Sequence, residues 1–131
     1  MCLFCKIINR DIPSNIVYED DKILAILDIS QATYGHTLVI PKLHVEDLLQ
    51  CPPDTLKQVM DVTQKLTTQI SEKLEAKGAN VLTNIHEVAG QTIMHFHVHI
   101  IPRYGDDDGI TIKMKQSQNI DFLTLLSKIK A

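Results

Sequence analysis

The sequence predicts a single domain of mixed helices and strands, and three observations support this prediction. The chain has 131 residues, which suits one domain core and leaves little room for two. Short β-branched runs dominate the N-terminal half, and a stripe of apolar residues at helical spacing fills the middle. The sequence shows no repeat, low-complexity tract or Gly/Ser linker, so we expect one domain over residues 1–131.

Three strands are expected in the N-terminal half. Residues 15–19 are rich in β-branched and aromatic side chains, and an acidic turn at residues 20–21 precedes a second run at residues 22–27. Residues 36–40 form a third β-branched run, which Pro41 stops because proline lacks the N–H of a central strand. This order predicts an antiparallel meander.

A long helix is expected in the middle of the chain, after a short helix at residues 44–50. Apolar residues recur at helical spacing between Asp54, which can cap the N-terminus, and Gly78, which follows the expected end at about Lys77. At 1.5 Å per residue this helix is roughly 35 Å long, longer than such a domain is wide. We therefore expect it to cross a whole sheet or to reach a partner subunit.

The C-terminal part predicts two more strands and one short helix. The strands are expected at residues 80–85 and 95–101, the second closed by Pro102, with a small polar loop at residues 87–92 between them. Residues 122–129 place four apolar side chains at positions i, i+3, i+4 and i+7, which predicts an amphipathic helix.

The composition excludes some classes of partner. The net charge is −3, from 13 basic and 16 acidic side chains, which gives no basic field for nucleic acid. No apolar run approaches the roughly 20 residues of a membrane span, and the first residues do not resemble a secretory leader. Three cysteines in such a chain indicate a reducing compartment, so we expect a cytoplasmic protein.

Three of the six histidines fall in the run His95-Phe96-His97-Val98-His99. Successive side chains of a strand point to opposite faces, so the three imidazoles should share one face and the apolar residues should enter the core under the long helix. A lone histidine is usually structural. A cluster of three titratable rings on one face indicates a functional site.

The spacing of these rings indicates separate duties. At about 3.3 Å per residue, neighbouring histidines lie about 6.6 Å apart and the outer pair about 13 Å apart. One metal ion with nitrogen ligands at about 2.0–2.1 Å cannot hold all three. His97, the central ring, is the natural nucleophile toward an anionic electrophile such as a phosphate, which a second histidine and the N–H groups of residues 90–92 can stabilise.

A second group of residues suits a structural metal site. Cys2 and Cys5 have the Cys-x-x-Cys spacing of metal ligands, although two buried thiols would share that spacing. His44 and His95 can complete a Cys₂His₂ site for zinc, which would leave His95 outside catalysis. Cys51 has no partner in the sequence and is interpreted as an inert thiol.

Several stretches of the sequence resemble the histidine triad (HIT) family. Residues 95–101 follow its signature His-Φ-His-Φ-His-Φ-Φ, where Φ is apolar, and Gly-Gln-Thr at residues 90–92 precedes it. Residues 35–44, with Gly-His at one end and Pro-Lys-Leu-His at the other, are also similar, as are residues 2–8 and 24–30.

This resemblance extends from about residue 2 to residue 109, and residues 110–131 diverge from the family. It is greatest for the short bacterial-type branch related to the histidine-triad nucleotide-binding proteins. It implies an α+β fold with a five-stranded antiparallel sheet, one long helix and one or two short helices, usually paired as a homodimer. It also implies hydrolysis or transfer at the α-phosphate of a purine nucleotide through a nucleotidyl-histidine intermediate.

The resemblance further implies roles for individual residues. His97 is the implied nucleophile and His99 a phosphate contact, with His36 close behind the catalytic strand. In zinc-containing members the ligands match the four residues of the expected metal site. The implied substrate-binding residues are Asp28 for the ribose hydroxyls, Asn84, Gln91 and Thr92 for the phosphate, and Ile7, Leu27 and Ile29 for the base.

Two positions depart from the family pattern, and the reaction has several candidates. His86 stands where many members have glycine, so its ring is expected at the phosphate entrance or the leaving group, and Thr92 replaces a common serine. A nucleoside 5'-phosphoramidate hydrolase is favoured, because a poor alkoxide leaving group would need a strong acid. The alternatives are a dinucleoside polyphosphate hydrolase, a non-catalytic nucleotide-binding zinc protein, and a metal hydrolase that uses His95 and His97 as ligands.

Overall fold

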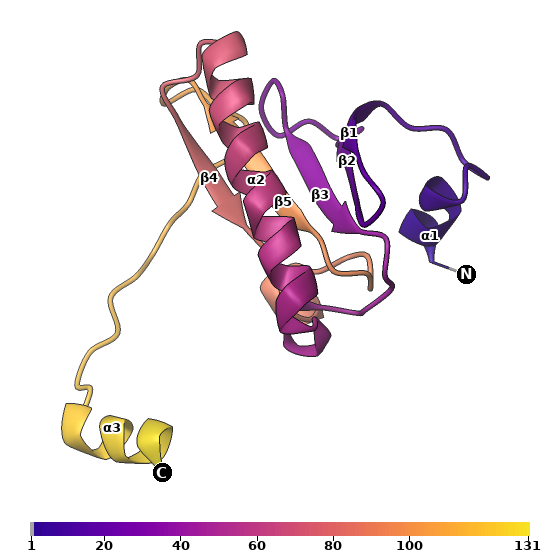
Figure 1. The fold of residues 1–131 in the computed structure, drawn as a ribbon. Helices are drawn as coiled ribbons and strands as arrows, with labels where there is room; N and C mark the ends of the chain where they lie inside the picture. The colour runs from indigo at the N-terminus through magenta and orange to yellow at the C-terminus, as the bar shows by residue number, and fades with distance from the viewer. Residues whose placement is uncertain (1) are drawn as a thin grey trace.

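A five-stranded antiparallel sheet forms the centre of the molecule, in the computed structural model of residues 2–131 (Figure 1). Its strand order is β1-β2-β3-β5-β4, so β1 and β4 are the edges. This arrangement confirms the expected fold class. The strands are β1 (Ile16–Glu19), β2 (Ile23–Leu27), β3 (Thr37–Pro41), β4 (Gly78–Leu82) and β5 (Val98–Arg103).

The long helix α2 (Pro53–Lys73) covers one face of this sheet and contacts four of its strands (Figure 1). Val59, Leu66 and Ile70 form the buried stripe of the helix. Phe96 and Ile100 pack into the same cluster, as the alternation in the histidine segment predicts. The sheet thus places the apolar residues of that segment under α2 and leaves the other face for the imidazoles.

A short helix, α1 (Leu3–Ile8), supplies the second cluster of buried residues, on the opposite face of the sheet. Phe4 and Ile7 of α1 pack with residues of β2 and β3 that alternate with those of the first cluster. Both central strands are therefore covered on two sides, which explains their continuous apolar sequence. The sequence analysis did not anticipate α1. The Cys2 thiol caps it by accepting a hydrogen bond from the N–H of Cys5.

Several predicted boundaries were wrong. Pro52, not Asp54, is the N-cap of α2, and the helix ends at Lys73, earlier than expected. The expected helix at residues 44–50 is only a 3₁₀ turn, η1 (Leu48–Gln50). A second 3₁₀ turn, η2 (Glu87–Ala89), follows β4.

The last strand also differs from the prediction, because β5 begins at Val98 and continues through Pro102. His95 and His97 therefore lie in the irregular segment before β5. Strand β3 pairs with β5 only as far as Ile100. Pro102 consequently lies where β5 has no hydrogen-bonding partner on the β3 side. The N–H that proline lacks is therefore not needed for pairing there.

The chain leaves the sheet after β5 and continues as an extended segment to α3 (Phe122–Lys130), which stands apart from the other elements (Figure 1). Asp121 caps this helix, whose position confirms the amphipathic pattern at residues 122–129. Phe122 is 68% exposed and Ile129 is 72% exposed, so the apolar face of α3 is open to solvent. Among residues 2–131, none of the helices has both the length and the apolar character to cross a lipid bilayer.

Candidate active site

A cavity of about 390 Å³ lies between α1, the end of β2 and the segment that precedes β5. This volume suits a small-molecule site. Phe4 and Ile93 contribute to its wall, and His97 and His99 open into it. Seven residues expected to be catalytic or to bind substrate line this single cavity, namely Ile7, Leu27, Asp28, Ile29, Thr92, His97 and His99.

The three triad imidazoles lie on the α1 side of the sheet, as the alternating pattern predicts. The rings of His97 and His99 are 5.0 Å apart between centroids. Phe4 makes edge contacts with His97 at 5.0 Å and with His95 at 5.9 Å. The short N-terminal helix therefore packs directly against the first two rings of the triad.

The surroundings of His97 determine which of its two ring nitrogens carries the proton. Its Nδ1 lies 2.7 Å from the backbone carbonyl of His95, which can only accept a hydrogen bond. The neutral ring must therefore carry its proton on Nδ1 and keep a lone pair on Nε2. Burial lowers the pKa of His97, although the His95 carbonyl and Asp28 oppose this shift, so the neutral form is favoured. A neutral imidazole with a free Nε2 is a competent nucleophile.

In His99 the proton lies on the other ring nitrogen, Nε2, because of its hydrogen bond with His36. The backbone N–H of Ala32 donates to Nδ1 of His36 at 3.2 Å, so the proton of a neutral His36 resides on Nε2. That Nε2 lies 2.9 Å from Nδ1 of His99 and 3.6 Å from the carboxylate of Asp28. His99 thus accepts at Nδ1 and carries its own proton on Nε2, where it can donate to an anionic oxygen. His36 thus lies behind the histidine segment, in hydrogen-bond contact with His99.

Desolvation keeps these rings neutral. Burial lowers the pKa of His99 to about 4, and the neighbouring His97 and His36 reinforce this shift while Asp28 opposes it. Burial also lowers the pKa of His36, against the opposing charge of Asp28. The site therefore presents one lone pair and one N–H donor, with no fixed positive charge on either ring.

The loop between β4 and the triad corrects the expectation for Gln91. Its backbone N–H donates to the carbonyl of His86, and its side-chain amide donates to the carbonyls of Glu46 at 2.6 Å and Ile93 at 3.1 Å. The buried amide of Gln91 is thus used within the protein and positions the loop, whereas Thr92 is exposed at the cavity. Asn84 donates one N–H to the carbonyl of Gly90 at 3.4 Å, and neither residue lines the cavity.

His86 also differs from its expected place. Its Nε2 lies 3.1 Å from the carboxylate of Asp47, so its ring turns toward that buried residue, and the residues that line the cavity do not include it. Its φ of 69° lies in the left-handed region that favours glycine. This backbone geometry accounts for the glycine that many family members have at this position.

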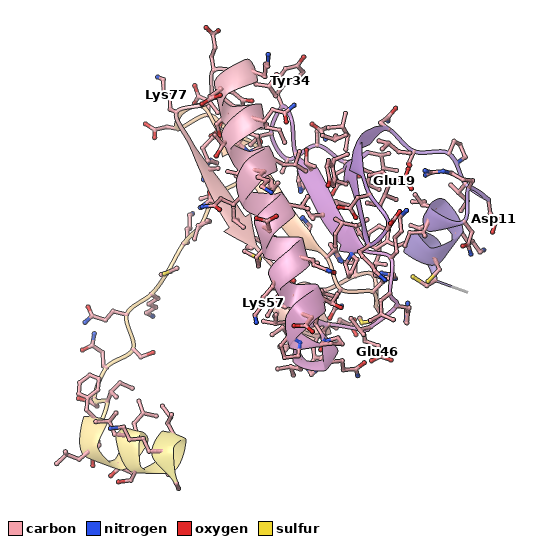
Figure 2. All side chains as sticks on the ribbon, in the orientation of Figure 1. Asp11, Glu19, Tyr34, Glu46, Lys57 and Lys77 are labelled. Carbon is pink, nitrogen blue, oxygen red and sulfur yellow. The ribbon has the colours of Figure 1, made fainter. Side chains whose placement is uncertain are left out.

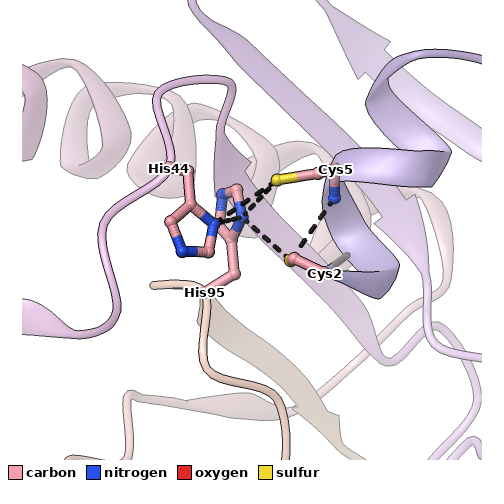
Figure 3. Close-up of side chains that lie close together, drawn as sticks. All are labelled: Cys2, Cys5, His44 and His95. Atoms are coloured by element: carbon pink, nitrogen blue, oxygen red, sulfur yellow. Dashed lines mark hydrogen bonds between the residues drawn. The ribbon is translucent and has the colours of Figure 1, made fainter.

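Four side chains converge at the outer end of the triad, namely Cys2, Cys5, His44 and His95 (Figure 3). Their ligand atoms all lie within 4.8 Å of one another. The Cys2 sulfur is 3.4 Å from Nδ1 of His95, the Cys5 sulfur is 3.4 Å from Nδ1 of His44, and the two nitrogens are 3.0 Å apart. The expected ligand set is thus assembled from α1, the segment after β3 and the segment before β5.

This cluster fits a tetrahedral metal site. Ligands at the usual distances from zinc, about 2.0–2.3 Å, are separated from one another by roughly 3.3–3.8 Å, which is close to the observed spacings. His95 also directs Nε2 to the carbonyl of Pro41 at 2.8 Å. That bond places its proton on Nε2 and leaves Nδ1 free as a ligand, the usual outer support of a metal-bound histidine.

Comparisons with known proteins agree with this geometry. A model of the HIT domain matches residues 9–106. The chain belongs to the HIT domain family. Protein hit of Bacillus subtilis is 52% identical over 108 residues, which are 82% of this chain and 74% of that protein. The adenylylsulfatase HINT3 of Arabidopsis thaliana is 40% identical over 102 residues, 78% of this chain and 52% of that protein.

Solved structures extend the similarity of this HIT domain beyond the triad. A HIT family protein from Bacillus anthracis superposes with a TM-score of 0.92 at 43% identity, over 98% of this chain and 94% of that one. A histidine triad nucleotide-binding protein from Candida albicans gives a TM-score of 0.88 at 34% identity, over 99% and 95% of the two chains. Both are similar over almost the whole of the chain.

Three residues that contact the site of this HIT domain, or the loops that form it, could not be identified from the sequence. Phe4 packs on the triad, but an apolar residue near a terminus gives no sign of that contact. Asp47 is buried beside His86, and only its place as the cap of η1 gave a local signal. Gln31 bonds the loop that carries His36, through partners that the sequence does not place near it.

The low pKa of His99 gives a prediction about stability. In the folded protein we expect this ring to stay neutral down to about pH 4, whereas in the unfolded chain it should titrate at the ordinary histidine pKa of 6.5. Because the unfolded chain then binds the proton first, the free energy of unfolding should fall between pH 6.5 and pH 4. Because the ring is only partly buried and solvent screens its charge, the loss due to this ring should stay below about 3 kcal/mol.

NMR titration of His99, combined with urea unfolding at several pH values, measures both effects. His99→Gln is the matched variant, because it lacks the titrating ring and should lose this part of the pH dependence. A folded-state pKa near 6.5 would contradict the prediction.

Proposed function

We propose that this protein is a hydrolase of purine nucleotides and that His97 attacks the α-phosphate. The observation that carries this proposal is the proton arrangement of the two rings in the cavity. His97 is held with a lone pair on Nε2, and the adjacent His99 is held with an N–H on Nε2. A nucleophile beside a donor is the pair that phosphoryl-group displacement requires.

The chemistry follows in two steps. Nε2 of His97 forms a bond to phosphorus as the bond from phosphorus to the leaving group breaks. The leaving group takes the bonding electron pair, and an amine whose nitrogen solvent has already protonated departs as a neutral molecule. Water then attacks the phosphorus of the nucleotidyl-histidine, the bond to Nε2 breaks and one proton of the water passes to solvent, which releases a nucleoside monophosphate and restores neutral His97. His99 donates its N–H to a phosphate oxygen in both steps, where charge accumulates.

The rest of the cavity suits the nucleoside. Asp28 lines it with one carboxylate oxygen already accepting the N–H of Ser30 at 2.8 Å, which fixes the carboxylate for the ribose hydroxyls. Ile7, Leu27 and Ile29 provide an apolar wall for a purine base. Ile29 is 93% exposed, so its side chain is available to pack against a bound base.

We propose a nucleoside 5'-phosphoramidate as the substrate class, with cleavage of the P–N bond. Two relatives support chemistry of this kind, since one is called an adenylylsulfatase and another a histidine triad nucleotide-binding protein. At neutral pH His99 is uncharged and offers a hydrogen bond but no acidic proton, which suits an amine leaving group that already carries a proton better than an alkoxide. A dinucleoside polyphosphate, whose leaving group is a phosphate, is the second candidate.

The converging Cys2, Cys5, His44 and His95 are proposed to bind zinc in a structural role. Bound there, zinc would tie α1 to the first histidine of the triad and so fix the position of Phe4 against His97. Cys2 and Cys5 are free thiols in the structure, and such a site requires reduced cysteines. This requirement supports the expected cytoplasmic location.

A homodimer is the proposed working unit. Strand β4 is an edge of the sheet, and a groove of about 690 Å³ runs between it and the outer surface of α2. Met60 and Val81, 42% and 43% exposed, give this groove an apolar floor, and Lys57 at its border projects from α2 (Figure 2). A second copy of the chain would cover the apolar residues and pair with the open edge of β4.

The nucleophile gives the first test of the proposal. His97→Ala should lower the turnover of adenosine 5'-phosphoramidate by roughly 10³–10⁶-fold. Its melting temperature should change little, since the ring lies at a cavity wall. Release of the monophosphate, followed by chromatography, measures the rate, and diadenosine tetraphosphate in parallel separates the two substrate classes. Full activity in His97→Ala would contradict the mechanism, and binding of AMP by the wild-type protein without turnover of either compound would indicate a non-catalytic module.

Metal analysis tests the structural zinc. We expect about one zinc per chain, bound through four ligands. Cys5→Ser should lose this zinc and melt at a lower temperature, whereas the matched variant Cys51→Ser should retain it. Inductively coupled plasma mass spectrometry gives the metal content. Immediate loss of catalysis on chelation, before any loss of stability, would instead favour a metal hydrolase.

The dimer makes a prediction about the groove. Val81→Arg places a charge on the proposed interface, so it should shift the protein toward the monomer in size-exclusion chromatography with light scattering. Val88→Arg is the control, because Val88 is 99% exposed on the loop at η2, away from the groove. A wild-type monomer at micromolar concentration would overturn the proposed dimer.

A further inference from the structure

We propose that Gln31 is a positioning residue for the triad. Its side-chain amide holds the loop at residues 28–36 in the conformation that orients His36, and His36 in turn determines which nitrogen of His99 carries the proton. This inference rests on the proposed function of the site.

The amide of Gln31 bonds both ends of this loop. Its nitrogen donates to the carbonyl of Asp28 at 2.6 Å and to the carbonyl of His36 at 2.7 Å. Its oxygen accepts from the N–H of Gly35 at 2.8 Å and from the N–H of His36 at 3.1 Å. Both amide hydrogens and both lone pairs are thereby engaged. Gln31 is exposed overall, yet its polar end is turned away from water and into the loop.

The outer side of the loop is held by the segment that follows β5. The hydroxyl of Tyr104 donates to the carbonyl of Tyr34 at 2.6 Å, and Tyr34 is labelled near the C-terminal end of α2 in Figure 2. Gly109 lies against Ala32 so closely that a Cβ atom on it would be 2.2 Å from the Ala32 carbonyl oxygen. The loop is thus supported from outside by this segment and from inside by Gln31.

The link from this loop to His99 is the backbone N–H of Ala32, the residue next to Gln31. That N–H donates to Nδ1 of His36, which places the His36 proton on Nε2 and directs it to Nδ1 of His99. If the loop relaxes, Nδ1 of His36 loses its donor and the ring can take the other tautomer. Two lone pairs would then face each other at 2.9 Å unless His99 also changes its tautomer. In that case His99 loses the N–H that it offers to the phosphate.

The same bonds argue against a metal ion at Asp28, His36 and His99, whose ligand atoms also lie within 4.8 Å of one another. A metal would need the lone pair of His36 Nε2. Because the N–H of Ala32 already uses the lone pair on Nδ1, the neutral ring has its proton, and no lone pair, on Nε2. The hydrogen bond from His36 to His99 therefore takes the place of a second metal centre in this cluster.

The experiment compares Gln31→Met, which has a similar shape and no hydrogen bonds, with the wild-type protein and with Gln58→Met on the exposed surface of α2. Outer residues that orient an active-site histidine usually change activity by about 10–100-fold when they are lost. We expect kcat for adenosine 5'-phosphoramidate to fall by about that factor in Gln31→Met, with KM changed less than about threefold. Gln58→Met should match the wild type.

The ¹⁵N NMR spectrum of His99 gives a readout that a merely structural role would not move. The wild type should show the Nε2–H tautomer, and Gln31→Met should show the Nδ1–H tautomer or a mixture. This measurement needs no turnover, so it is distinct from the test of the proposed function, which fails if the wild type hydrolyses no nucleotide. An unchanged kcat and tautomer in Gln31→Met would overturn the inference, as would a rise in KM alone.

A milder variant covers the case in which Gln31→Met does not fold. Tyr104→Phe removes one outer bond to the loop and leaves the ring in place, so it should lower kcat by a smaller factor and shift the His99 tautomer in the same direction. If Tyr104→Phe folds with wild-type kcat and an unmixed Nε2–H tautomer at His99, the loop does not control that ring and the inference is wrong.

Discussion

The hydrogen bonds between imidazole rings and backbone groups are the constraint on which the rest of the site depends. The carbonyl of His95 fixes the proton of His97, and the N–H of Ala32 fixes that of His36. The carbonyl of Pro41 does the same for His95. Backbone groups cannot exchange donor for acceptor, so each ring receives one role from the course of the main chain. The fold influences the protonation of the rings because it orients these backbone groups, and no charged side chain is needed for this.

The two functions attributed to the histidine run share one residue and one helix. His95 presents Nδ1 to the cysteines and offers its own carbonyl to His97. Helix α1 brings Cys2 and Cys5 to one end of the run, and its Phe4 contacts the His97 ring. A metal at the outer end would therefore stabilise the same segment whose backbone sets the proton of His97.

Much of this arrangement is local in sequence and could be predicted. The alternation of residues 95–101 gave the shared face of the rings, and the spacing of Cys2 and Cys5 gave half of the metal cluster. The strand patterns gave five strands in the right order along the chain, although the limits of β4 and β5 differ from those expected by two to three residues. Helix α1 could not be predicted, because its six residues are too few to show a periodic pattern and it is stabilised by packing on β2 and β3.

The differences from prediction share a cause. Contacts between residues far apart in the sequence decide which groups a polar side chain bonds and where a strand ends. Gln91 was interpreted as a phosphate donor, but Glu46, 45 positions away, takes its amide hydrogen. Strand β5 was expected to begin at His95 and to stop before Pro102, yet its limits follow from where β3 and β4 end beside it.

The close approach of Gly109 to Ala32 divides the chain into two parts. Substitutions should be tolerated less readily up to Gly109 than in residues 110–131. Gly109 of the C-terminal segment lies against the loop behind His36, and there is no space there for even a methyl group. Beyond it, the extended segment and α3 stand clear of the sheet. Residues 110–131 can therefore accept substitutions, changes of length or a new partner without disturbing the rings. Gly109 itself cannot be replaced by a residue with a side chain unless Ala32 moves.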